Sequence, residues 1–76
     1  DISLALSLYQ KILEQYPNDI LADDALFRMA EIYDRRMSNI AKALACYQQL
    51  FLSYPGSVYV IEARKRYRIL RGDKIN

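Results

Sequence analysis

The sequence predicts an all-α protein made of antiparallel helix-turn-helix repeats, with about four helices. Three observations predict this class. Apolar residues recur at three- and four-residue steps along most of the chain, which is the period of an amphipathic helix. The pattern repeats itself after 38 residues. Of the 76 residues, 53% are hydrophobic and only two are glycine and two proline, which excludes a disordered tail and a many-stranded β fold.

Apolar stripes and breaking residues define the first two helices. The first is expected over residues 4–16 and stops at Pro17, because a proline ring clashes with the preceding helical turn. The second is expected from about Leu21 to Arg35, and the side chain of Asp19 can cap its start. Their stripes consist of Leu4, Ala5, Leu8, Tyr9, Ile12, Leu13 and Tyr16, and of Ala22, Ala25, Leu26, Met29, Ala30 and Tyr33.

A third helix is expected over about 40–53. Ser38 and Asn39 break the pattern before it and can cap its start, and Pro55-Gly56 ends it. Its stripe consists of Ile40, Ala43, Leu44, Tyr47, Leu50, Phe51 and Tyr54.

The fourth helix is expected over about 58–70, with Ser57 as its cap. Gly72 is a typical C-terminal stop, because glycine readily adopts the left-handed conformation found there. Residues 73–76 are expected to form a frayed tail. The apolar side of this helix consists of Tyr59, Val60, Ala63, Tyr67 and Leu70.

A shift of 38 residues lays the first helix on the third. Over residues 4–17 the shift gives six identities: Ala5 with Ala43, Leu6 with Leu44, Tyr9 with Tyr47, Gln10 with Gln48, Tyr16 with Tyr54, and Pro17 with Pro55. The small residue lets two helix backbones approach closely, and the aromatic residue one turn later fills the space beside it. We therefore divide the chain into the second helix of a truncated repeat (1–17), one complete repeat (21–55), a C-terminal capping helix (57–72) and a tail (73–76).

The run from Ala25 to Tyr33, followed by Ala43 to Leu50 and then Pro55, resembles a tetratricopeptide repeat. In that family a large residue, a small residue and a tyrosine mark the first helix of each pair, and an alanine, an aromatic residue and a proline mark the second. Leu26 stands where the family usually has tryptophan, and the linkers are a few residues longer. The resemblance implies an α-solenoid that binds proteins or peptides. The longer variety is similar to tetratricopeptide proteins of bacterial cell envelopes, which favours the envelope or periplasm, with the cytoplasm possible.

Ligands of that family usually bind the concave surface that the first helix of each pair forms. Four residues of the second helix are spaced to share this side, and Lys65 occupies the place on the fourth helix that is equivalent to Phe27. The candidate partner contacts are Asp24, Phe27, Glu31, Asp34 and Lys65. They indicate either an ordinary solvated face or an acidic groove with one aromatic anchor for a basic or amphipathic peptide. The Lys, Arg and Asn set that clamps a carboxylate terminus in the family is not present on the second helix.

The fourth helix is strongly basic. Residues 58–76 hold six basic and two acidic residues, whereas residues 1–57 hold five and seven. Three arginines replace residues against which a further repeat would pack: Arg64 replaces Leu26, Arg68 replaces Ala30, and Arg71 replaces Tyr33. The first interpretation is a polar cap that ends the stack.

The alternative is a basic-helix adaptor that binds nucleic acid, an anionic membrane surface or an acidic partner through residues 64–71, or a salt-bridged contact with another molecule. The basic patch would consist of Arg64, Lys65, Arg66, Arg68 and Arg71. Nucleic acid is the less expected partner, because the aromatic residues needed for stacking belong to the core stripes.

The sequence shows no catalytic constellation. Histidine is absent, which removes the commonest general base and metal ligand, and there is no glycine-rich loop for phosphate. The single cysteine, Cys46, excludes an internal disulfide and is expected to be a small buried hydrophobe. We therefore expect neither an enzyme nor a cofactor or metal site.

The chain begins with Asp1-Ile2-Ser3 rather than methionine, so we interpret it as a piece of a longer protein, and the C-terminal cap suggests the end of that protein. No apolar run approaches the roughly 20 residues needed to span a membrane. Because the first helix lacks its own partner helix, we expect an open apolar flank and self-association of this fragment.

Overall fold

A computed structural model describes residues 1–72 of the chain, and the expected tail at 73–76 lies outside the described residues. The described part contains four α-helices, one π-helical turn and no strand. The elements are α1 (Ile2–Gln15), α2 (Ile20–Glu31), the π-helical turn η1 (Ile32–Arg36), α3 (Ile40–Ser53) and α4 (Val60–Arg71). The all-α class predicted from the sequence is therefore confirmed.

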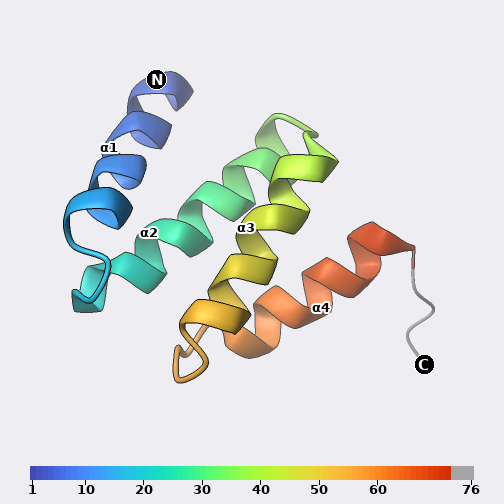
Figure 1. Ribbon diagram of the computed structural model, residues 1–76. Coiled ribbons are helices and arrows are strands. Elements are labelled where there is room, and N and C mark those ends of the chain that lie inside the picture. Colours follow the sequence, from blue (N-terminus) through green and yellow to red (C-terminus); the bar gives the residue numbers. More distant parts are fainter. Residues whose placement is uncertain (73–76) are drawn as a thin grey trace.

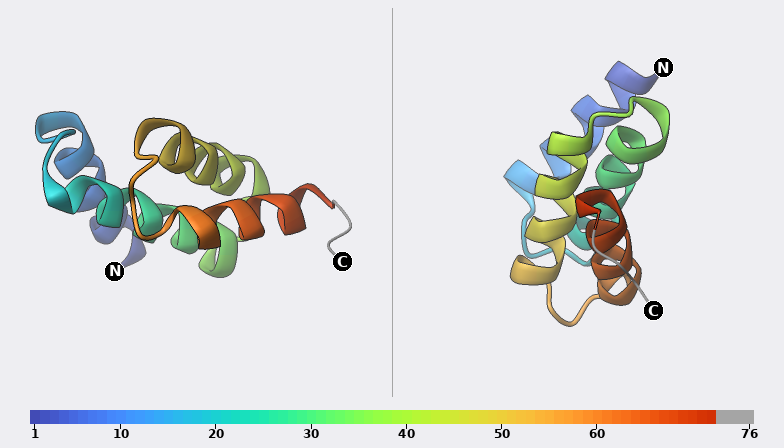
Figure 2. Two further views of the ribbon diagram at one scale, coloured as in Figure 1. Left: turned by 90° about the horizontal axis from the view of Figure 1, so that it is seen from below. Right: turned by 90° about the vertical axis from the view of Figure 1, so that its right-hand side faces the viewer.

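The helices lie side by side in chain order, and each runs against the direction of the one before it (Figure 1). Both views in Figure 2 place α3 on one side of the molecule and α2 and α4 on the other. The chain is therefore an open stack of two helix layers, and α1 and α4 are its two ends.

The same turn connects α1 to α2 and α3 to α4. Tyr16 and Tyr54 end their helices with similar backbone angles (φ −136° and ψ 54°, against φ −128° and ψ 59°), because a following proline disfavours the helical conformation. Each tyrosine N–H still donates to the carbonyl four residues earlier, at 2.8 Å. Asp19 and Ser57 then accept from the backbone N–H two residues later, at 2.9 and 3.1 Å. The repeat in the sequence is thus a repeat of backbone geometry.

The second helix does not continue regularly to Arg35 as expected. It widens into η1, where the N–H of Met37 donates to the carbonyl of Ile32, five residues back, at 3.0 Å. Ser38 then has a φ of 51°, the left-handed conformation that ends the helix. The side chain of Asn39 caps α3, as predicted, by accepting from the backbone N–H three residues later at 3.1 Å.

The fourth helix starts later than expected and ends where expected. α4 begins at Val60 rather than at Val58, because Val58 and Tyr59 lie in a turn in which Ser57 accepts from the N–H of Tyr59. The predicted role of Ser57 as the helix cap is therefore wrong: Tyr59 is the N-cap, and no side chain caps this end. Gly72 ends the helix with a φ of 83°, which confirms its predicted role as a left-handed stop.

The core lies between α2 and α3 and reaches α4. Leu26, Tyr47 and Leu50 are its largest fully buried side chains, and buried alanines of all three helices let the backbones approach. In contrast, α1 has no fully buried residue, and Leu4 and Leu8 on its predicted stripe are 59% and 53% exposed. The apolar flank expected on the first helix is therefore open.

The side chain of Tyr54 links the two turns, and Tyr16, the equivalent residue 38 positions earlier, provides a matched control. The hydroxyl of Tyr54 donates to the carbonyl of Pro17 at 2.7 Å, whereas Tyr16 is 60% exposed and has no such bond within residues 1–72. We expect Tyr54→Phe to lower the free energy of unfolding by about 1 kcal/mol and Tyr16→Phe to leave it nearly unchanged. Urea unfolding followed by circular dichroism measures both, and equal effects would contradict a structural role for this bond.

Candidate functional site

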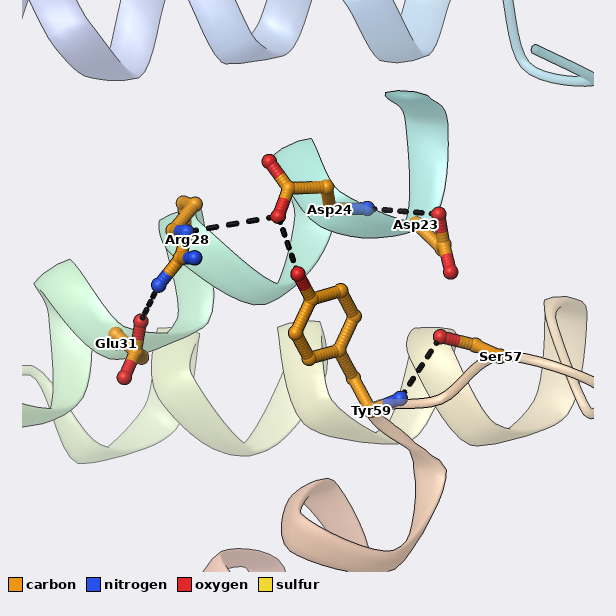
Figure 3. Close-up of polar contacts among 6 residues, drawn as sticks. All are labelled: Asp23, Asp24, Arg28, Glu31, Ser57 and Tyr59. Atoms are coloured by element: carbon orange, nitrogen blue, oxygen red, sulfur yellow. Dashed lines mark hydrogen bonds and ion pairs between the residues drawn. The ribbon is translucent and has the colours of Figure 1, made fainter. Parts of the chain in front are cut away.

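Asp24 and Glu31, two of the acidic residues expected to line a concave groove, are engaged within the chain (Figure 3). Asp24 accepts a hydrogen bond from the hydroxyl of Tyr59 at 2.6 Å and lies 3.6 Å from Nε of Arg28. Arg28 also donates to Glu31 at 3.0 Å. The bond to Asp24 raises the pKa of the Tyr59 hydroxyl, and the bond to Glu31 raises the pKa of Arg28. The bond between Tyr59 and Asp24 fastens the start of α4 to α2, and the contacts of Arg28 lie within α2.

Phe27 is not the exposed aromatic anchor that the sequence predicted. Its side chain is only 6% exposed, and its ring stacks on Tyr59 with the centroids 4.5 Å apart and an angle of 12° between the ring planes. The ring of Tyr47 lies 6.2 Å away on another side. The prediction is wrong because Tyr59, which belongs to the next repeat, covers this position of α2.

Asp34 also lies inside the molecule, so its predicted place in an open groove is wrong. The residue is 8% exposed. Its Oδ2 accepts from the hydroxyl of Tyr47 and from Nε of Arg66, each at 2.8 Å, and its Oδ1 accepts from Nη2 of Arg66 at 2.8 Å. The contact with Arg66 is therefore bidentate, the strongest geometry for such a pair.

The Asp34 carboxylate is charged because its partners outweigh its burial. Burial alone would raise the pKa of Asp34, but the hydrogen bonds from Arg66 and Tyr47 lower it, and the net shift is downward. The same bond raises the pKa of Arg66, while burial and the carboxylate together raise the pKa of Tyr47. No side-chain polar atom buried within residues 1–72 lacks a partner.

The structure separates the residues of the predicted basic patch. Arg66 turns inward to Asp34, and Lys65 is exposed at a different place on α4. The other three arginines line an open groove between α3 and α4, the α3–α4 groove, whose lining residues are Gln48, Phe51, Arg64, Tyr67, Arg68 and Arg71.

Two aromatic rings form the floor of the α3–α4 groove. The rings of Phe51 and Tyr67 meet edge to face with their centroids 5.3 Å apart. The guanidinium carbon of Arg64 lies 5.5 Å from the Phe51 centroid, and that of Arg71 lies 5.4 Å from the Tyr67 centroid. Sequence reasoning assigned both rings to the core and missed the groove, although the 38-residue shift relates its residues to those of α1 and α2.

Two further expectations concern membranes and metals. None of the helices within residues 1–72 is both long and apolar enough to cross a bilayer. Over the same residues, no group of histidine, cysteine or acidic side chains is placed to hold a metal ion. Cys46 is partly buried against the core, and burial raises the pKa of its thiol.

The alternating helices, the repeated Tyr-Pro turn and the buried alanines define a helical repeat protein. The sequence matches the tetratricopeptide repeat family over residues 1–19 and 24–57, which is more than half of the chain, and the chain belongs to that family. No curated protein and no solved structure matches it. Repeats of this family generally mediate protein–protein interactions and are typically non-catalytic.

Neutralising the buried carboxylate should destabilise the fold. We expect Asp34→Asn to lower the free energy of unfolding by about 2–4 kcal/mol, because Arg66 loses its ionic partner in a largely buried site. The matched control, Glu14→Gln, removes an exposed carboxylate of α1 and should cost less than about 0.5 kcal/mol. Urea unfolding measures both free energies, and similar losses would contradict the structural role of Asp34.

The Asp34 carboxylate also makes the free energy of unfolding depend on pH. Because the folded-state pKa of Asp34 is lowered, its contribution is complete above the unfolded-state pKa, about 3.9, and disappears as the pH falls through the lower folded-state value. The gap in unfolding free energy between the wild-type chain and Asp34→Asn should therefore shrink from about pH 5 to pH 2. Denaturant titrations across this range test the expectation, and a constant gap would refute it.

Proposed function

We propose that this chain is a non-catalytic protein–protein interaction scaffold and forms the C-terminal part of a tetratricopeptide repeat array. The observation that carries the proposal is a comparison of α1 with α3. On α3, Ala43, Tyr47 and Leu50 are fully buried between α2 and α4. On α1 the equivalent residues are Ala5, Tyr9 and Ile12, and none of them is fully buried.

The open stripe of α1 has the chemistry of a surface for another helix. It carries Leu4 and Leu8, both more than half exposed, and within residues 1–72 the main packing neighbour of α1 is α2. Exposed apolar residues that continue a helical stripe are typical of contact surfaces. A stripe that is covered in one repeat and open in its equivalent supports binding of a further helix.

The concave face contributes less to this proposal than the sequence indicated. Phe27 and Asp34 belong to the core, and Asp24 is bonded to Tyr59. Glu31 and Lys65 retain exposed surface there, and we propose them as the partner contacts on that face.

The alternative function, a basic adaptor for nucleic acid or an anionic membrane, has one observation in its favour. Three arginines converge on the α3–α4 groove. However, Arg66 is paired with Asp34, and the two rings of the groove meet edge to face instead of forming a platform on which bases stack. These contacts favour the scaffold over the adaptor.

Self-association of the isolated chain tests the open stripe. We expect the wild-type chain to form dimers at high micromolar concentration in sedimentation velocity experiments, and Leu8→Glu to be monomeric, because a charge on the stripe opposes burial. Ile61→Glu is the matched control: Ile61 is 83% exposed on α4, and its replacement should leave the dimer intact. A monomeric wild-type chain would count against the scaffold, and an equal loss in Ile61→Glu would place the contact elsewhere.

A further inference from the structure

An earlier part of the chain has an equivalent of the α3–α4 groove, and there the structure shows which helix occupies it. Shifted by 38 residues, its lining corresponds to a groove between α1 and α2, formed by Gln10, Leu13, Leu26, Met29, Ala30 and Tyr33. This groove between α1 and α2 is filled by α3. Leu26 and Ala30 belong to one buried cluster with Ala43, Tyr47 and Leu50 of α3, and Leu13 and Tyr33 pack against it. Within this chain, a groove of this kind holds an amphipathic helix.

The α3–α4 groove keeps the apolar floor of its counterpart but changes the walls. Phe51 and Tyr67 replace Leu13 and Met29, so a helix would still meet an apolar surface. The walls become cationic: Arg64 replaces Leu26, Arg68 replaces Ala30, and Arg71 replaces Tyr33. Among residues 1–72, none of the residues that line the groove is acidic. An occupant must therefore bring carboxylates opposite the arginines and apolar side chains over the rings.

We propose that the α3–α4 groove binds an acidic amphipathic helix of another protein. This rests on the proposed function of the chain as a protein-binding scaffold and names the class of partner. The positive walls select carboxylates, which guanidinium groups bind through directed hydrogen bonds. The apolar floor and the internal counterpart favour a helix laid in the groove, with anchors at helical spacing.

Other occupants fit the groove less well. A second copy of the chain could place its α1 against α4, in the way that α3 lies against α2. However, the helical residues of α1 include one lysine and one glutamate, so α1 brings no excess of negative charge. Nucleic acid would need ring faces on which successive bases stack, but the two rings of the groove meet edge to face. A membrane surface would need exposed apolar side chains beside the groove arginines, but the exposed isoleucines of α4, Ile61 and Ile69, are not among the residues that line the groove.

The test uses the whole chain and a matched pair of synthetic peptides. Each peptide is held helical by a side-chain staple and carries leucine and tyrosine on one stripe. One has glutamates on both flanks of the stripe, and its twin has glutamines. Fluorescence anisotropy measures binding to the wild-type chain, and we expect the glutamate peptide to bind about tenfold more tightly at low salt, with the difference falling as salt rises.

Two double variants locate the site. Arg64→Gln with Arg68→Gln should weaken binding of the glutamate peptide about tenfold, because two ionic contacts are lost. Lys11→Gln with Arg36→Gln removes the same charge from exposed positions outside the groove and should change the affinity less than about twofold. All four positions are exposed, and circular dichroism checks that each variant is folded.

Several results would overturn the proposal. Equal affinity for the two peptides, equal losses in the two double variants, or no binding at all would do so. Tighter binding of duplex DNA or of phosphatidylserine-containing vesicles, lost in the Arg64/Arg68 variant, would assign the groove to the adaptor function instead. If the peptide fails while the α1-dependent dimer persists, only this inference falls; if the dimer is also absent, the scaffold proposal falls with it.

Discussion

The buried carboxylate of Asp34 is the interaction on which the arrangement of the last three helices depends. It lies at the end of the second helix and is held by Tyr47 of α3 and Arg66 of α4. A buried charge is strongly unfavourable unless it is paired and hydrogen-bonded, so all three elements must be in place together. The contact therefore joins one repeat to the first helix of the next and sets the rotation of α4 about its own axis.

That rotation determines which side chains α4 presents to solvent. Successive residues of an α-helix are about 100° apart, so residues two positions on either side of Arg66 point to nearly the opposite side. With Arg66 fixed inward by Asp34, Arg64 and Arg68 are carried outward and line the α3–α4 groove. The groove is thus a consequence of the buried pair, and one helix uses the same residue type for a core contact and for a surface.

The sequence predicted the features that depend on neighbours along the chain. Helical periodicity, the Tyr-Pro ends and the caps at Asp19 and Asn39 are local, and the structure confirms them. The placement of Phe27 and Asp34 could not be predicted in this way. Tyr59, which covers Phe27, comes from the next repeat, and the π-helical turn η1 changes the angle between successive side chains, so regular spacing from α2 misplaces Asp34.

A solvating cap and a binding groove are compatible uses of the same arginines. A cap needs only hydrophilic side chains, and lysine would serve as well. Arginine adds a flat cation that stacks over a ring, and Arg64 and Arg71 lie in this way over Phe51 and Tyr67. In the free chain these groups shield two apolar rings from water. A partner helix with carboxylates would draw the guanidinium groups to its flanks and uncover the rings beneath its apolar stripe, so the side chains that end the stack also select what can extend it.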